Sequence, residues 1–186
     1  MRRLLMLLGL LMALPAHAAV QVIFPAYATG EAQRLVPGAQ TLVCGRFVQP
    51  THALGLTRVA VNVTTGFGVG KVVGWALYPD LDAGTALFSV GNQPAAVAAP
   101  VVATVTAFDV TGGVTYRDCI CATGTAGAYA APHWLPDGIS VAALQNSFVA
   151  SVGTAANPCD VNGNPPATTG AITPDDTLAP PFVVAE

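Results

Sequence analysis

The sequence LTRVAVNV (Leu56–Val63) decides the fold class of this chain. Its aliphatic residues recur at every second position, which is the period of a β-strand whose successive side chains point to opposite faces of a sheet. We therefore expect a half-buried strand here. The residues predicted to share its apolar face are Thr57, Val59, Val61 and Val63, with Arg58 and Asn62 on the other face.

Comparable segments flank this one, and turns rich in Gly and Pro separate them. Closely spaced strand signals without helical stretches between them are typical of all-β sandwiches and barrels. The predicted fold class is all-β, a single antiparallel β-sandwich of jelly-roll-like type. The further predicted strands are Thr41–Val48 (TLVCGRFV), Val72–Tyr78 (VVGWALY), Thr85–Val90, Val101–Val110 with Thr104 and Thr106 on its polar side, and Val114–Cys121 (VTYRDCIC).

The carboxyl-terminal part is less regular. Residues 157–181 are rich in the turn formers Pro, Gly, Asn and Asp, so we expect a loop-rich segment there. Phe182–Ala185 (FVVA) is predicted to close the fold as a last strand. Residues 141–148 suit a short helix, because Val141, Leu144 and Phe148 have helical spacing, and they suit a strand equally well.

The first eighteen residues have the layout of a secretory signal peptide. Their apolar run is about half as long as a membrane-spanning helix requires. We expect a signal peptide over residues 1–18, one mature domain over residues 19–186, and a secreted protein in the periplasm, outside the cell or at the cell surface. The features of the signal are Arg2 and Arg3, the apolar run Leu4–Leu14, Pro15, and the cleavage site Ala16-His17-Ala18.

Charged residues make up 9% of the chain. Without residues 1–18 the chain has five basic and ten acidic side chains, a net charge of −5. The basic residues form no cluster, so neither nucleic acid nor anionic lipid is an expected partner. Abundant Val, Thr, Gly and Pro favour sheets and turns over disorder.

The four cysteines are Cys44, Cys119, Cys121 and Cys159. An even number in an exported protein predicts two disulfides. Cys119 and Cys121 share one face of a predicted strand and would bond to each other only in a strained geometry. Each is therefore expected to pair with Cys44 or Cys159, and both pairings remain open. A metal or redox site is the weaker interpretation, because a lone Cys-x-Cys lacks the spacing of zinc ligands.

Four segments carry a family resemblance: Leu56–Thr65, Val72–Tyr78 with the acidic turn after it, Asp82–Thr85, and Thr111–Tyr116. Together they resemble a β-sandwich module of phage tail and tail-fibre-type proteins and of some secreted bacterial proteins. The resemblance extends from Gly38 to about Tyr129 and covers about half of the chain. It implies a jelly-roll-like structural or attachment element with no known catalytic role.

Few residues suit catalysis. The chain has no Gly-x-Ser-x-Gly motif, and the histidines outside the signal, His52 and His133, lie in turn-like sequences. Asp80 and Asp82 have the residue types of an acid–base pair, which glycosidases hold across a cleft. Both lie in one Pro-Asp-Leu-Asp-Ala-Gly turn, for which a hydrogen-bonded turn is the simpler interpretation. We expect a protein that is not an enzyme.

The segment Cys159–Asn164 (CDVNGN) places oxygen-bearing side chains at alternate positions, as calcium loops do. The candidate ligands are Asp160, Asn162 and Asn164. Pro165 stands where such a loop needs Gly, and Ala171 stands where it needs a bidentate Glu. An ordinary turn is therefore the preferred interpretation. We expect no cofactor, with calcium as the alternative.

Two tryptophans have different settings. Trp75 lies in an apolar strand and is predicted to belong to the core. Trp134 lies between Pro132 and Pro136, near Tyr129 and His133. This aromatic set suits a ligand-stacking surface, and it suits covering an open edge of the sandwich equally well.

These observations predict a secreted, non-catalytic structural or adhesive surface protein. A carbohydrate-binding module that uses Trp134 and Tyr129 is one alternative. A self-assembling fibre subunit is another, because Val20–Phe24 (VQVIF) is a strand-like segment suited to pairing with a neighbour's exposed sheet edge. The expected partners are glycans, other surface proteins or further copies of the chain, and no membrane span is expected in the mature chain.

Overall fold

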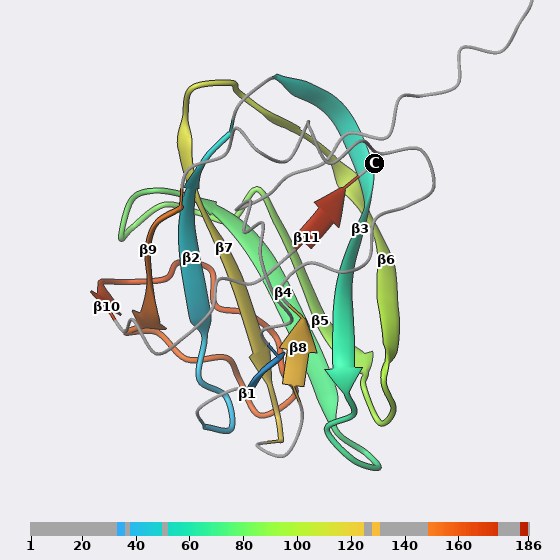
Figure 1. Cartoon of the computed structure of the whole chain (residues 1–186). Helices are drawn as coiled ribbons and strands as arrows, with labels where there is room; N and C mark the ends of the chain where they lie inside the picture. The colour runs from blue at the N-terminus through green and yellow to red at the C-terminus, as the bar shows by residue number, and fades with distance from the viewer. Residues whose placement is uncertain are drawn as a thin grey trace, which may run out of the picture.

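Two antiparallel sheets face each other in the computed structural model, which describes residues 33–35, 38–49, 52–124, 128–130, 149–174 and 183–185 (Figure 1). These residues contain no helix, so the predicted all-β, antiparallel sandwich is confirmed. Sheet A contains β1 (Gln33–Leu35), β3 (Ala53–Thr65), β6 (Ala99–Val110), β8 (Ala128–Ala130) and β11 (Val183–Ala185). Sheet B contains β2 (Val43–Val48), β4 (Val72–Pro79), β5 (Phe88–Pro94), β7 (Thr115–Ala122), β9 (Val149–Ala155) and β10 (Ile172–Pro174).

The order of the strands leaves one side of the sandwich open. In sheet A, β3 pairs with β6 along one edge and with both β8 and β11 along the other, and β1 pairs with β8. Sheet B has the order β10–β9–β2–β7–β4–β5. In the described part of the chain, β5 ends sheet B and β6 ends sheet A, and they do not pair with each other.

The hydrophobic core lies between the two sheets. Sheet B contributes Phe47, Trp75 and Leu77, and sheet A contributes Val59 and Val61, all of them almost completely buried. The prediction that Trp75 belongs to the core is confirmed, since none of its surface is exposed. Each large apolar side chain buried in this way stabilises the fold by about 1.5–3 kcal/mol relative to an exposed one. These contacts hold the two sheets together.

The alternation predicted for residues 56–63 is correct over its second half only. Val59, Val61 and Val63 face the core as expected, but Thr57 is exposed. The pairing of β3 with β6 shifts register between Leu56 and Arg58, which interrupts the alternation of faces. Leu56 takes the inward position instead and is 1% exposed.

Every strand predicted within the described residues is present, with shifted ends. The apolar stretch 72–78 is β4, which has a neighbour on each side as a central strand should. Residues 183–185 form β11 and pair with β3. The loop-rich segment predicted from residue 157 also contains a short strand, β10. The predictions for residues 1–18, 20–24 and 141–148 lie outside the described residues.

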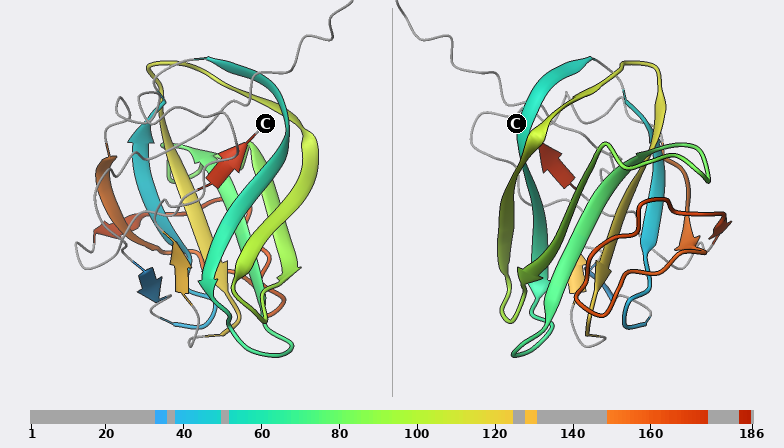
Figure 2. Two further views of the ribbon diagram at one scale, coloured as in Figure 1. Left: turned by 45° about the vertical axis from the view of Figure 1, so that its right-hand side comes forward. Right: turned by 180° about the vertical axis from the view of Figure 1, so that it is seen from behind.

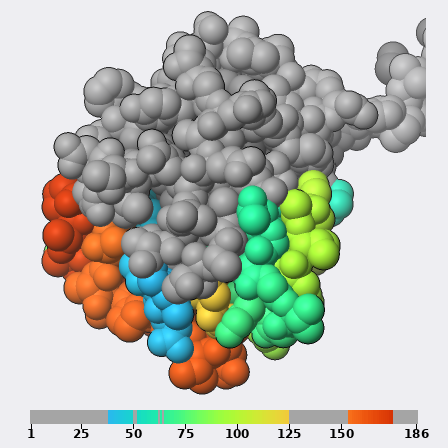
Figure 3. Space-filling view, turned by 60° about the horizontal axis from the view of Figure 1, so that its bottom comes forward, coloured from blue at the N-terminus to red at the C-terminus, as the bar shows by residue number. Residues whose placement is uncertain are grey.

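A segment that we name the strap, residues 156–171, covers the outer face of sheet B. Figure 2 (right) shows this orange-to-red segment crossing the face of sheet B that is turned away from sheet A. Beneath it is a second buried cluster, in which Ala76 and Tyr78 of β4 lie beside the cysteines. In Figure 3 the strap borders the blue segment that leads into β2, where the Cys159 amide donates to the Gln40 carbonyl at 2.9 Å.

Both disulfides lie in this outer cluster, and the structure decides between the two open pairings. Cys44 pairs with Cys119, which lies directly opposite it in the ladder of β2 and β7, with 4.1 Å between the Cα atoms. Cys121 pairs with Cys159 of the strap, with 6.5 Å between the Cα atoms. As predicted, Cys119 and Cys121 share one face of a strand and bond to different partners.

Two glycines allow the strap to approach the sheet closely. A Cβ atom at Gly74 would collide with the carbonyl oxygen of Gly163, and one at Gly91 would collide with the side chain of Asn164. The buried Tyr78 hydroxyl donates to the Pro166 carbonyl at 2.7 Å. Burial raises the pKa of Tyr78 far above its ordinary value, so this hydroxyl keeps its proton in neutral solution.

Replacing Cys121 and Cys159 together by Ala should release the strap. The bond closes a span of 38 residues, and removing it should lower the free energy of unfolding by about 2–4 kcal/mol in urea titration. Hydrogen exchange should then accelerate at the amides of Asn157 and Cys159, which donate to Thr169 and Gln40, while the β4–β7 ladder stays protected.

The matched control is the Cys44→Ala, Cys119→Ala pair. It should also lower stability, but it should leave the exchange rates of the strap amides unchanged, because that disulfide joins two strands of sheet B. Equal exchange rates at Asn157 in the two double variants would show that the strap does not depend on its own disulfide.

Candidate functional site

The two aspartates considered as an acid–base pair belong to a cluster of ion pairs. Arg117 lies on β7 and is almost completely buried, and its Nε donates to Asp80 Oδ1 at 2.8 Å. Its Nη2 donates to Asp82 Oδ1 at 2.8 Å, and its Nη1 donates to Thr169 of the strap at 2.7 Å. Arg46 of β2 also donates to Asp80 through Nε and Nη2. The Arg117 guanidinium group thus joins β7 to the turn and the strap, and Asp80 joins this cluster to β2.

This arrangement determines the ionisation of Asp80. Burial of the carboxylate raises its pKa, but hydrogen bonds from Arg46 and Arg117 and the charges of both groups outweigh burial, so the pKa lies below its ordinary value. The Asp82 side chain is 61% exposed. Within the described residues, Arg117 is its one ion-pair partner. A carboxylate held ionised between two arginines is suited to joining structural elements and poorly suited to donating a proton.

The candidate calcium ligands form a compact turn in the strap. Asp160 accepts hydrogen bonds from the backbone amides of Asn162 and Asn164, each at 2.8 Å, and from the Asn164 side chain at 2.8 Å. The bond from the Asn164 side chain and the two backbone bonds hold the pKa of Asp160 below its ordinary value. Gly163 has a φ of +72°, as a tight turn requires. Both oxygens of the carboxylate thus accept hydrogen bonds within the turn.

The remaining predicted site residues are not brought together in the described residues. His133 and Trp134 lie outside them, and Tyr129 lies in β8, opposite Arg34 of β1 and Val63 of β3. His52 is exposed immediately before β3, and its Nδ1 accepts a hydrogen bond from the Gly112 amide at 3.4 Å.

The open side of the sandwich contains a groove that sequence reasoning missed. Strands β5 and β6 diverge from the connection that joins them, residues 95–98 (Figure 2). Phe88 and Phe108 bridge the two strands with ring centroids 4.8 Å apart. We name the space between these strands the seam groove; its volume is about 780 Å³.

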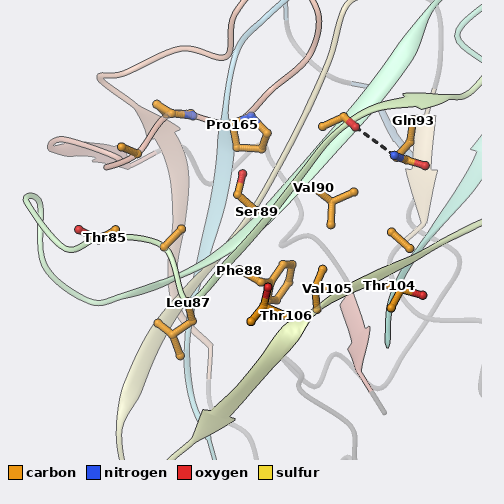
Figure 4. A pocket seen from close by; sticks show the side chains of 15 residues that line it. Thr85, Leu87, Phe88, Ser89, Val90, Gln93, Thr104, Val105, Thr106 and Pro165 are labelled. Atoms are coloured by element: carbon orange, nitrogen blue, oxygen red, sulfur yellow. Dashed lines mark hydrogen bonds between the residues drawn. The ribbon is translucent and has the colours of Figure 1, made fainter. Parts of the chain in front are cut away.

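The seam groove has an apolar floor and neutral walls. Phe88 and Val90 of β5 and Ala103 and Val105 of β6 form the floor, and Figure 4 shows Phe88, Val90 and Val105 gathered between the two strands. Ala103 and Val105 pack against the core but remain partly exposed. Pro165–Ala167 of the strap form the wall beside β5. The polar lining residues are all uncharged: Thr85, Ser89, Gln93, Thr104 and Thr106.

The edges that border the groove carry none of the charges that commonly protect edge strands. No Asp, Glu, Lys, Arg or His occurs from residue 83 to residue 108, a run of 26 residues. Native proteins usually block such edges with charged side chains, Pro or bulges. Here the end of β5 near the connection is interrupted by two features. One is a bulge formed by Gly91 and Asn92, and the other is Pro94. Phe88–Val90 remains a regular edge.

The described residues include no helix long and apolar enough to cross a membrane. They also include no group of three or more His, Cys, Asp or Glu side chains placed to hold a metal ion. Comparisons with protein-family models, with curated proteins and with solved structures found no match.

Replacing Asp80 by Asn tests the ion-pair cluster. The pKa of Asp80 is lower in the folded chain than in the unfolded chain, so its stabilising effect is complete above about pH 5 and is lost as the pH falls below about 4. At pH 7 the variant should be less stable by about 1–3 kcal/mol, because Arg117 loses a partly buried partner. The difference from the unchanged protein, measured by urea unfolding, should shrink between pH 5 and pH 2.5.

The control for this experiment is Asp82→Asn. Because Asp82 is exposed and makes one ion pair in the described residues, this change should lower stability by less than about 1 kcal/mol at pH 7. A difference between Asp80→Asn and the unchanged protein that stays constant down to pH 2.5 would contradict the role assigned to Asp80.

Proposed function

We propose that the protein is an exported, non-catalytic structural component of a cell or particle surface that associates with other protein chains through the seam groove. The observation that carries the proposal is the apolar, uncharged lining of the seam groove. The groove combines an apolar floor with two sheet edges that carry no charged residue from position 83 to position 108, and such edges pair readily with an added strand.

The chemistry of the groove favours binding over catalysis. General acid–base and nucleophilic catalysis need ionisable or activated side chains placed at a cleft. The residues that line the seam groove are all uncharged. Asp80 is instead engaged by two arginines on the outer side of sheet B. A surface of this kind suits an extended apolar peptide better than a substrate that must be protonated or attacked.

The two disulfides support the proposal that the protein is located outside the cytoplasm. Two disulfides form within 168 residues that follow the predicted signal peptide, and disulfides persist chiefly in oxidising compartments. The resemblance to structural modules of tail-type and secreted proteins agrees with this proposal. We therefore propose that the surface assembly to which the chain belongs serves in attachment.

Turnover assays on the mature chain test this function. Glycoside, ester and peptide substrates should be hydrolysed no faster in the presence of the protein than in buffer. In a separate measurement, the exported protein should contain no titratable thiol. Turnover that disappears in Asp82→Asn, whose fold we expect to be almost unaffected, would overturn the proposal. Asp80→Asn with its fold checked by circular dichroism is the second variant for the same assay.

A further inference from the structure

The seam groove has the shape and chemistry of an acceptor for one β-strand. A strand added to the edge of β5 that pairs with no described strand would extend sheet B. Its side chains on one face would then lie over Ala103 and Val105, which are only partly covered now. Its side chains on the other face would lie near Pro165–Ala167 of the strap. In the groove, the edge of β5 would thus pair with the backbone of the added strand. The side chains of β6 and of the strap would contact its two faces.

A segment of the same chain has the matching pattern. In Val20–Phe24 (VQVIF), Val20, Val22 and Phe24 alternate with Gln21 and Ile23. A strand of five residues is about 17 Å long, and β5 itself has seven residues. The segment is free of charge, so its insertion would place no ionised group against the apolar floor. It would also lie at the new amino terminus once the predicted signal peptide is removed.

The place where this segment enters the fold favours a second copy as the acceptor. Gln33 begins β1, which pairs with β8 on the side of β3 opposite to β6. β1, into which the donor segment leads, and β6, which borders the acceptor groove, therefore lie at opposite edges of sheet A. The eight residues between Phe24 and Gln33, about 29 Å long when extended, let the donor segment reach a neighbouring copy. This arrangement lets each copy donate on one side and accept on the other.

We propose that Val20–Phe24 of one copy inserts as a strand along β5 in the seam groove of the next copy, so that copies join head to tail. The proposal rests on the proposed function, because it identifies the partner that the groove receives. Such an interface is heterologous and produces open chains unless its rotation closes a ring. In these chains every groove except the terminal one is filled.

Two variants of the mature chain separate donor from acceptor. Val22→Asp places a charge in the donor segment and leaves the groove intact, and Ala103→Glu blocks the groove and leaves the donor intact. In sedimentation at about 100 µM, the unchanged protein should form a series of oligomers and each variant alone should be monomeric. An equimolar mixture should stop at a dimer, because the Ala103→Glu chain donates to the Val22→Asp chain and cannot itself accept.

The matched controls change neighbouring positions outside the proposed contact. Thr29→Asp places the same charge between the donor segment and β1, and Val102→Glu alters the exposed outer face of sheet A. Both controls should assemble as the unchanged protein does. Circular dichroism and the absence of free thiols verify that each variant is folded.

A peptide experiment keeps the test decisive if Ala103→Glu does not fold. A synthetic peptide of residues 19–27 should bind the Val22→Asp protein in calorimetric titration and should protect the amides of Phe88–Val90 from hydrogen exchange. The same peptide carrying Val22→Asp should bind at least tenfold more weakly. Equal affinities of the two peptides would overturn the proposal.

The other outcomes each exclude the proposed occupant. A monomeric unchanged protein whose residues 20–24 are protected from exchange would show insertion into its own groove. Assembly that survives Val22→Asp and fails in Ala103→Glu would show that another segment fills the groove. Assembly through another segment leaves the proposed function in place. Insertion into its own groove would remove the proposed association through the groove, and catalytic turnover would remove the non-catalytic role.

Discussion

The attachment of the strap to the outer face of sheet B is the constraint on which the rest of the structure depends. Strands β4 and β7 are buried on both faces, and a strand of that kind is stable only if something covers each face. Sheet A covers one face, and the strap covers the other through Cys121–Cys159 and Arg117. Without this cover, Ala76 and Tyr78 would be exposed to water.

The same constraint explains where the charges lie. A strap made largely of Pro, Gly, Asn and Thr buries little apolar surface, so it is held by specific bonds. Arg117 is the centre of these bonds. It holds Asp80 and Asp82 at the outer side of sheet B, and Asp80 in turn binds Arg46. The open side of the sandwich has no charged residue from position 83 to position 108 of β5, β6 and their connections. One region is therefore fixed by ion pairs, and the other offers a neutral surface.

Sequence patterns predicted local structure well and spatial arrangement poorly. The strand at 101–110 follows from periodicity, because its burial alternates with the pleat. The strand at 72–78 follows from its unbroken apolar run, because both of its faces are buried. Thr57 was assigned to the wrong face, because the register shift between Leu56 and Arg58 depends on how β6 twists beside β3. The choice between two cysteine pairings was open for the same reason: only the register of β2 and β7 places Cys44 opposite Cys119.

The seam groove shows why a site of this kind is difficult to find from sequence. Both bordering strands were predicted, but a strand's own residues do not tell which of its edges stays unpaired; that depends on the order of all strands in both sheets. One signal was present, the run of 26 residues without an ionisable side chain. In a protein that exposes two sheet edges, such a run is a liability unless a partner covers it. The absence of protective charge over residues 83–108 therefore supports the proposal that a strand binds there.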